Sequence, residues 1–189
     1  MPTFVEEIQS VAQGDDAEFR RRLSDRIETV GDAIAVLEEW TESSRETHAE
    51  LSSKYDTAKT LARDEIREAT GADAEDVPAE DLVSHSAVTD RTKQLLSEYS
   101  TKLYVFLDEE RSYEGARGEL LDALGAELAL YERLSGELGD DVTSVRDAQE
   151  AIARFAREET PGRASRTATD VLLESGVDEA AFSEEQEPG

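Results

Sequence analysis

The apolar residues between Leu95 and Leu138 recur at steps of three, four or seven, which is the spacing along one face of an α-helix. The residues on this face are Leu96, Tyr99, Leu103, Phe106, Tyr113, Leu120, Leu124, Leu128, Tyr131 and Leu138. The run from Leu103 to Leu107 is apolar all round, so we expect it to be buried on more than one side. The pattern predicts a helix over about 87–138, with the core centred on Leu103 and Phe106.

A second heptad pattern fills the preceding part of the chain and predicts a helix over about 16–70. Its apolar positions are Leu23, Ile27, Val30, Ile34, Leu37, Leu51, Tyr55, Ala58 and Ala62. A helix of that length spans about 75 Å and requires a partner helix along most of it. Gly71 marks its end and Pro78 the start of the next helical segment, so the connection has only about ten residues. Such a short connection predicts an antiparallel hairpin of the two long helices.

Shorter helices are predicted on either side of the hairpin. Thr3 and Glu6 have the spacing of a capping box, which starts a short amphipathic helix over 3–13. After the hairpin, apolar residues at helical spacing predict helices over about 144–159 and 163–175.

These patterns together predict an all-α fold. Its main feature is a long antiparallel helical hairpin, similar to a coiled coil, with the shorter N- and C-terminal helices packed as a bundle. We expect a single helical domain over 1–182, because a chain of 189 residues is of ordinary size for one domain. The last residues, 183–189, are acidic and are predicted to form a disordered tail.

The chain is strongly acidic, with 46 Asp and Glu against 20 Lys and Arg and a formal net charge of −26. Because the chain also has helical apolar stripes, this excess of carboxylates is typical of a folded acidic surface rather than of a disordered polyanion. We interpret it as adaptation to the molar salt of a halophilic cytoplasm. The alternative is an acidic protein that binds a basic partner. A charge of this sign disfavours nucleic acid as a partner.

Several classes of protein are disfavoured by what the sequence lacks. It contains no cysteine, which excludes disulfides, thiolate catalysis and cysteine-ligated metal sites. Its first residues have neither the basic nor the apolar region of a secretory signal. Its longest apolar runs are about five residues, far short of a membrane span. We therefore expect a cytoplasmic protein without a membrane segment.

No pattern typical of an enzyme stands out. Gly115 and Gly118 lie within a helical pattern and lack the lysine and the preceding strand of a phosphate-binding loop. His48 falls on the seam of the first long helix, beside Thr41 and Ser44. We interpret it as part of a polar layer that fixes helix register rather than as a metal ligand or a proton-sensitive switch. We predict no catalytic residue, cofactor, metal or small-molecule substrate.

Two features are candidates for contact with other macromolecules. Trp40, the sole tryptophan, lies just off the seam of the first long helix, where it either packs under another helix or anchors a partner protein. Arg163 and Arg166 belong to a basic cluster in the C-terminal helices. They define an alternative function, in which the protein is a DNA-associated regulator that reads DNA with the region 152–173.

Apolar residues outside the seam predict self-association. The short helices are not long enough to cover the second face of the hairpin, and an uncovered apolar stripe usually marks a partner surface. Two-fold self-association is the commonest way to bury such a stripe, so we expect a homodimer with Leu121, Leu128 and Tyr131 at or near the contact. The sequence thus favours a non-enzymatic, acidic, helical scaffold or interaction protein that acts through coiled-coil-type helix packing.

Overall fold

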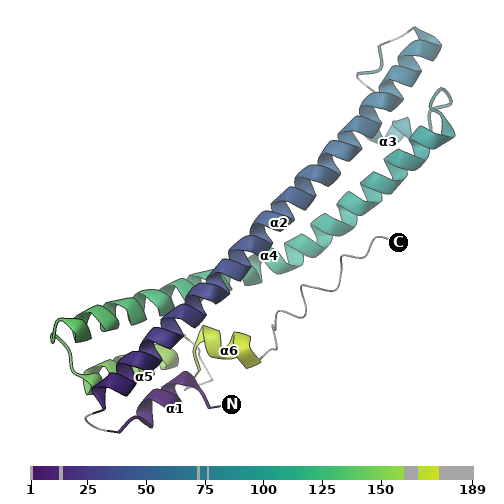
Figure 1. Cartoon of the computed structure of the whole chain (residues 1–189). Coiled ribbons are helices and arrows are strands. Elements are labelled where there is room, and N and C mark those ends of the chain that lie inside the picture. Colours follow the sequence, from purple (N-terminus) through teal and green to yellow (C-terminus); the bar gives the residue numbers. More distant parts are fainter. Residues whose placement is uncertain (1, 13–14, 72, 76, 160–165, 175–189) are drawn as a thin grey trace, which may run out of the picture. The chain divides into compact units, whose positions relative to one another are not determined.

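Figure 1 shows the computed structural model, which describes residues 2–12, 15–71, 73–75, 77–159 and 166–174. The helices are α1 (Phe4–Gln9), α2 (Asp16–Thr70), α3 (Ala79–Leu82), α4 (Asp90–Gly139), α5 (Val145–Glu159) and α6 (Ala168–Glu174). The described residues contain no strand. The long helices α2 and α4 pack against each other as a hairpin, and shorter helices accompany them. The predicted all-α hairpin bundle is therefore confirmed.

Local capping explains where the first helices begin and end. The Thr3 hydroxyl accepts the N–H of Glu6 at 3.3 Å and the Glu6 carboxylate accepts the N–H of Thr3 at 2.9 Å, which confirms the capping box of α1. A carboxylate oxygen of Asp15 accepts the N–H of Glu18 at 3.2 Å and so caps α2. Gly71 has a φ of 68°, a left-handed conformation in which glycine commonly ends a helix.

The C-terminal helices begin with the same kind of cap. The Ser144 hydroxyl accepts the N–H of Asp147 at 3.2 Å and precedes α5. Helix α6 lies within the range predicted for the last helix, 163–175, and the first part of that range is outside the described residues. The predicted acidic tail, 183–189, also lies outside the described residues.

The chain divides into two compact units. The first unit comprises residues 1–38 and 117–189, and the second comprises residues 39–116. The single domain over 1–182 stays a prediction. The buried core of the first unit consists of Phe4, Val5, Ile8, Val11, Phe19, Leu23, Val30, Leu124, Tyr131, Leu134, Leu138, Ala148, Ile152 and Ala156. Helices α1 and α5 thus complete a core that α2 and α4 alone would leave half open.

The second unit has a smaller core, made of shorter side chains. Its buried residues are Ala58, Ala62, Ile66, Ala74, Leu82, Val88 and Leu96. They come from the adjoining ends of α2 and α4, from α3 and from the connection between the two long helices. Because Ala58 and Ala62 are on the predicted seam of the first long helix and are buried, the heptad register of α2 is confirmed in this unit.

The middle of α4 differs from the prediction. Tyr104 is 72% exposed, Val105 is 47% exposed and Leu107 is 42% exposed, whereas Leu103 and Phe106 are half-buried. The expectation that this run is buried on more than one side, at the centre of the core, is therefore wrong. The physical reason is that, among the described residues of the second unit, α2 is the helix that packs beside this part of α4, as the stacking of His48 on Phe106 shows, so a single face of α4 is covered.

The carboxylate of Glu65 on α2 binds the N-terminus of α4. It accepts the N–H of Thr89 at 2.7 Å and the hydroxyls of Thr89 and Thr92 at 3.0 and 2.7 Å. Burial raises the pKa of Glu65, but the hydrogen bonds from Thr89 and Thr92 outweigh it and hold the pKa below its ordinary value. Glu65 therefore ties the two long helices together near their connection.

Glu65→Gln is expected to lower the free energy of unfolding by about 1 kcal/mol at neutral pH, because an amide oxygen is a weaker acceptor than a carboxylate. A depressed folded-state pKa means that this contribution is present above the ordinary pKa of 4.5 and is lost as the pH falls through the folded-state pKa. Urea unfolding of the wild type and the variant measures it. The difference should shrink between about pH 7 and about pH 3. A difference of equal size at both pH values would mean that the charge of Glu65 has no part in the contact.

Candidate functional site

A cluster of buried charges lies in the first unit, where α1, α2, α4 and α6 meet. Arg26 on α2 contacts Glu127 on α4 with its Nε at 3.3 Å and Asp170 on α6 with its Nη2 at 2.7 Å. The Glu127 side chain is completely buried, and those of Arg26 and Asp170 are each 8% exposed. One guanidinium thus faces two carboxylates away from solvent. Such a group is stable only if further hydrogen bonds satisfy the remaining oxygen atoms.

The remaining oxygen atoms are satisfied by hydroxyl and backbone donors. Glu127 accepts the Tyr131 hydroxyl at 3.0 Å, the Thr169 N–H at 3.1 Å and the Thr169 hydroxyl at 2.9 Å. Asp170 accepts the N–H of Phe4 at 3.3 Å and the N–H of Thr167 at 3.1 Å. The donors at 167 and 169 belong to the N-terminal turn of α6. The cluster therefore holds both short terminal helices, α1 and α6, against the long ones.

The charges of the cluster affect the pKa values of Arg26 and Tyr131. Burial lowers the pKa of the Arg26 guanidinium, but the charges of Glu127 and Asp170 outweigh burial and raise that pKa above its ordinary value. Burial and the neighbouring charge of Glu127 raise the pKa of the Tyr131 hydroxyl well above its ordinary value. Because every group is buried and already hydrogen-bonded, the arrangement is suited to fixing helices rather than to proton transfer with a substrate.

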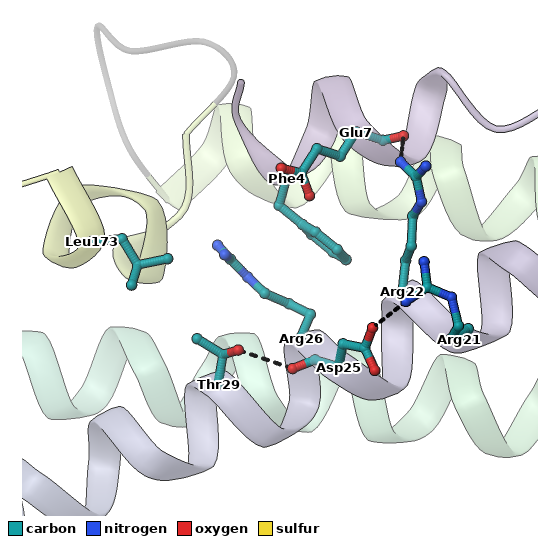
Figure 2. Close-up of a pocket in the computed structure, with 8 residues that line it drawn as sticks. All are labelled: Phe4, Glu7, Arg21, Arg22, Asp25, Arg26, Thr29 and Leu173. Atoms are coloured by element: carbon teal, nitrogen blue, oxygen red, sulfur yellow. Dashed lines mark hydrogen bonds and ion pairs between the residues drawn. The ribbon is translucent and has the colours of Figure 1, made fainter. Parts of the chain in front are cut away.

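A hollow lined by three arginines lies beside this cluster (Figure 2). Its lining residues are Phe4, Glu7, Arg21, Arg22, Asp25, Arg26, Thr29 and Leu173. Arg21 pairs with Glu18 and Asp25, and Arg22 pairs with Glu18 and donates to the backbone carbonyl of Glu7 at 2.7 Å. Hydrogen bonds from Arg21 and Arg22 lower the pKa of Glu18 to about 2. These guanidinium groups are thus already paired within the chain, and the hollow shows no feature that selects a ligand.

The second unit contains a groove with aromatic and acidic walls, which we call the aromatic groove. It is lined by Trp40, Ser43, Ser44 and Thr47 on α2 and by Phe106, Glu109, Glu110 and Tyr113 on α4. The rings of Trp40 and Tyr113 lie 6.1 Å apart, centroid to centroid, at 57° to each other. Tyr113 is 55% exposed and Glu109 is also exposed. The groove therefore offers aromatic surface and carboxylate charge together.

The predicted polar layer around His48 is only partly present. The Ser44 hydroxyl donates to the Glu110 carboxylate across the two helices. His48 itself is exposed, and its ring stacks on that of Phe106 with centroids 6.2 Å apart and planes 11° from parallel. His48 thus lies on the seam, opposite Phe106 of α4, but the expectation that it is buried there is wrong. His48 is exposed because the core of the second unit forms further along α2, from Ala58 onward.

The residues predicted to contact partners fall in different places. Trp40 is half-buried in the aromatic groove. Leu121 and Leu128 are half-buried in the first unit. Tyr131 is fully buried, with its ring against that of Phe4 at 5.3 Å, so it belongs to the core and offers no exposed contact surface.

The basic cluster of the C-terminal region is described only in part. Arg166 pairs with Glu174 within the same segment, and Arg163 lies outside the described residues. On α5, Ile152 and Ala156 are buried in the core of the first unit. The DNA-reading role of the region 152–173 stays a prediction.

Sequence reasoning missed the buried charge cluster. Arg26 and Glu127 are 101 positions apart, and Arg26 and Asp170 are 144 positions apart, so no local pattern joins them. One signal was present. Glu127 lies between Leu124 and Tyr131 on the apolar face of α4, where a carboxylate is out of place unless it has a buried partner. In a chain with 46 acidic residues this signal is easily overlooked.

Comparison of the chain with models of protein families, with curated proteins and with solved structures finds no match. Within the described ranges, no group of three His, Asp or Glu side chains is placed so that it could hold a metal ion. None of the helices in the described part of the chain has both the length and the apolar composition that crossing a membrane requires. Any functional inference therefore rests on the surfaces described above.

Proposed function

We propose that this protein is a non-enzymatic helical scaffold of a salt-rich, halophilic cytoplasm that acts by packing its helices against other protein chains. One observation carries the proposal. Apolar side chains in the middle of α4 stay exposed in a unit that is built mainly from two long helices. Exposed apolar patches on a folded protein usually mark a partner surface.

The first partner that we propose is a second copy of the chain. Tyr104 and Leu107 are three positions apart on α4, so their side chains lie on one side of the helix. When two hairpins meet along such a face through a two-fold axis, each copy covers the face of the other and four helices form a bundle. This moves the expected contact from Leu121, Leu128 and Tyr131 to the middle of α4.

The double variant Tyr104→Ser/Leu107→Ser is expected to be monomeric, because it removes the apolar area that a second copy would cover. Light scattering in molar KCl measures the mass, which should be close to 20.8 kDa for this variant. Val142→Ser is the matched control, because Val142 is as exposed as Tyr104, at 72%, but lies in the first unit. It should keep the wild-type mass. A fully helical double variant that also kept the wild-type mass would show that self-association does not use this face.

A further inference from the structure

We propose that the aromatic groove binds a basic, amphipathic helix of a partner protein, with a Lys or Arg side chain of that helix between the aromatic rings and the carboxylates. The inference rests on the proposed function, because it names the chemistry of a partner for the same scaffold. It concerns a different surface from the Tyr104 and Leu107 face, so the two can be tested separately.

The spacing of the lining residues favours a helical partner. On α2 they stand at positions 40, 43, 44 and 47, and on α4 they stand at 106, 109, 110 and 113. Each set has the i, i+3, i+4, i+7 pattern of one helix face, over two turns and about 10 Å of helix axis. A groove between two packed helices with walls of this kind accepts the side-chain ridge of a third helix.

The chemistry of the walls favours a cation over a purely apolar side chain. Trp40 and Tyr113 present aromatic rings, which attract Lys and Arg through their π faces. Glu109, which is exposed, and Glu110, which also accepts the Ser44 hydroxyl, line the same groove three to four positions before Tyr113. A wholly apolar helix would bury surface against the rings but would also take the Glu109 carboxylate out of water without a partner, which costs free energy. A helix with apolar residues and a well-placed cation can bury its apolar side chains against the aromatic rings and pair its cation with the carboxylates.

The charges at the aromatic groove also distinguish between the partners that could bind there. Because molar salt screens charges beyond about 3 Å, the Glu109 and Glu110 carboxylates at the groove, rather than the net charge, favour a cationic side chain and disfavour phosphate groups. A second copy bound at the groove through a two-fold axis would place its own Glu109 and Glu110 against those of the first copy, and like charges in direct contact disfavour such a complex. A basic partner protein is therefore the occupant that the groove fits.

The test uses a synthetic helical peptide of about five turns, with leucine on one face and arginine beside it. A second peptide replaces every arginine by citrulline, which keeps the shape and removes the charge. Trp40, the sole tryptophan, reports binding directly through its fluorescence. In molar KCl, where screening acts over about 3 Å, the arginine peptide should shift the Trp40 emission saturably. The citrulline peptide should bind at least about threefold more weakly.

Paired variants of the full chain separate the groove from bulk charge. Glu109→Gln/Glu110→Gln should weaken the arginine peptide by about three- to tenfold, because it removes both carboxylates and keeps the shape. Glu46→Gln/Glu68→Gln is the matched control. It changes the net charge by the same amount at exposed positions of the second unit that do not line the groove, and its affinity should stay within about twofold of wild type.

Four outcomes would overturn the proposal. With the peptides, these are the absence of a saturable Trp40 shift, or equal affinities for the arginine and citrulline peptides. The other two are an equal loss of affinity in both double variants, and an affinity for spermidine equal to that for the arginine peptide, which would assign the groove to small polycations. The failure of the proposed self-association is distinguishable. The mass of the Tyr104→Ser/Leu107→Ser variant tests self-association, and this variant should still bind the arginine peptide. Glu109→Gln/Glu110→Gln should leave the mass unchanged.

Discussion

Arg26→Met is expected to lower the free energy of unfolding by about 3–5 kcal/mol, the usual cost of removing one partner from a buried ion cluster. The variant leaves the Glu127 and Asp170 carboxylates buried without their shared cation, and their hydroxyl and backbone donors do not replace its charge. Methionine retains much of the apolar stem of arginine, so the loss of charge rather than of volume determines the result. Urea unfolding followed by helical circular dichroism in molar KCl measures the change.

Arg21→Met is the control for this prediction. Arg21 also pairs with two carboxylates, Glu18 and Asp25, but its side chain is 60% exposed. Exposed pairs contribute little to stability, so the control should lose less than about 1 kcal/mol. Equal losses for the two variants would show that the buried cluster does not depend on its guanidinium, and that the hydroxyl and backbone donors suffice to hold α1 and α6.

Removal of KCl is expected to abolish much of the helical circular dichroism, and its return should restore the signal. Acidic residues outnumber basic ones by 46 to 20, so the folded chain repels itself. Screening shortens that repulsion from a range of about 30 Å in dilute buffer to about 3 Å at molar salt. The ion pairs in the described part of the long helices are mostly i,i+3 and i,i+4 pairs, such as that of Lys102 with Glu98, and they leave the excess of carboxylates uncompensated.

Choline chloride at the same ionic strength is the control, because it tests whether screening rather than potassium is the cause. It should restore helicity as KCl does. The interpretation of the composition as adaptation to salt would be contradicted if the helical signal and the melting temperature were the same in dilute buffer and in molar KCl.

The parts of the fold that depend on local pattern could be predicted from the sequence. Helix α2 runs from Asp16 to Thr70, as the uninterrupted heptads and the following Gly71 indicate. The caps at Thr3 and Ser144 form as their spacing predicts, because a cap joins residues only three positions apart. In such interactions both partner residues lie within one or two turns of the same helix, so their spacing can be recognised in the sequence.

The parts that depend on a third layer of helices could not be predicted. The run around Tyr104 has the composition of a buried segment, yet in the described part of the chain Tyr104, Val105 and Leu107 stay exposed. Tyr131, on the same helix, is buried, with its ring against Phe4 of α1 and its hydroxyl bound to Glu127, which also accepts hydrogen bonds from the start of α6. Heptad spacing identifies the face of a helix that is apolar, but it does not identify the element that covers that face. For the same reason the partner of Glu127 could not be found from sequence alone.

The molar mass of the wild-type protein in molar KCl tests the central claim most directly, because a scaffold that packs its helices against a second copy cannot be monomeric. Light scattering at micromolar concentration should give twice 20.8 kDa, consistent with a second copy covering the Tyr104 and Leu107 face. A mass of 20.8 kDa from a fully helical sample would contradict the account, because the exposed apolar side chains of α4 would then remain in contact with water.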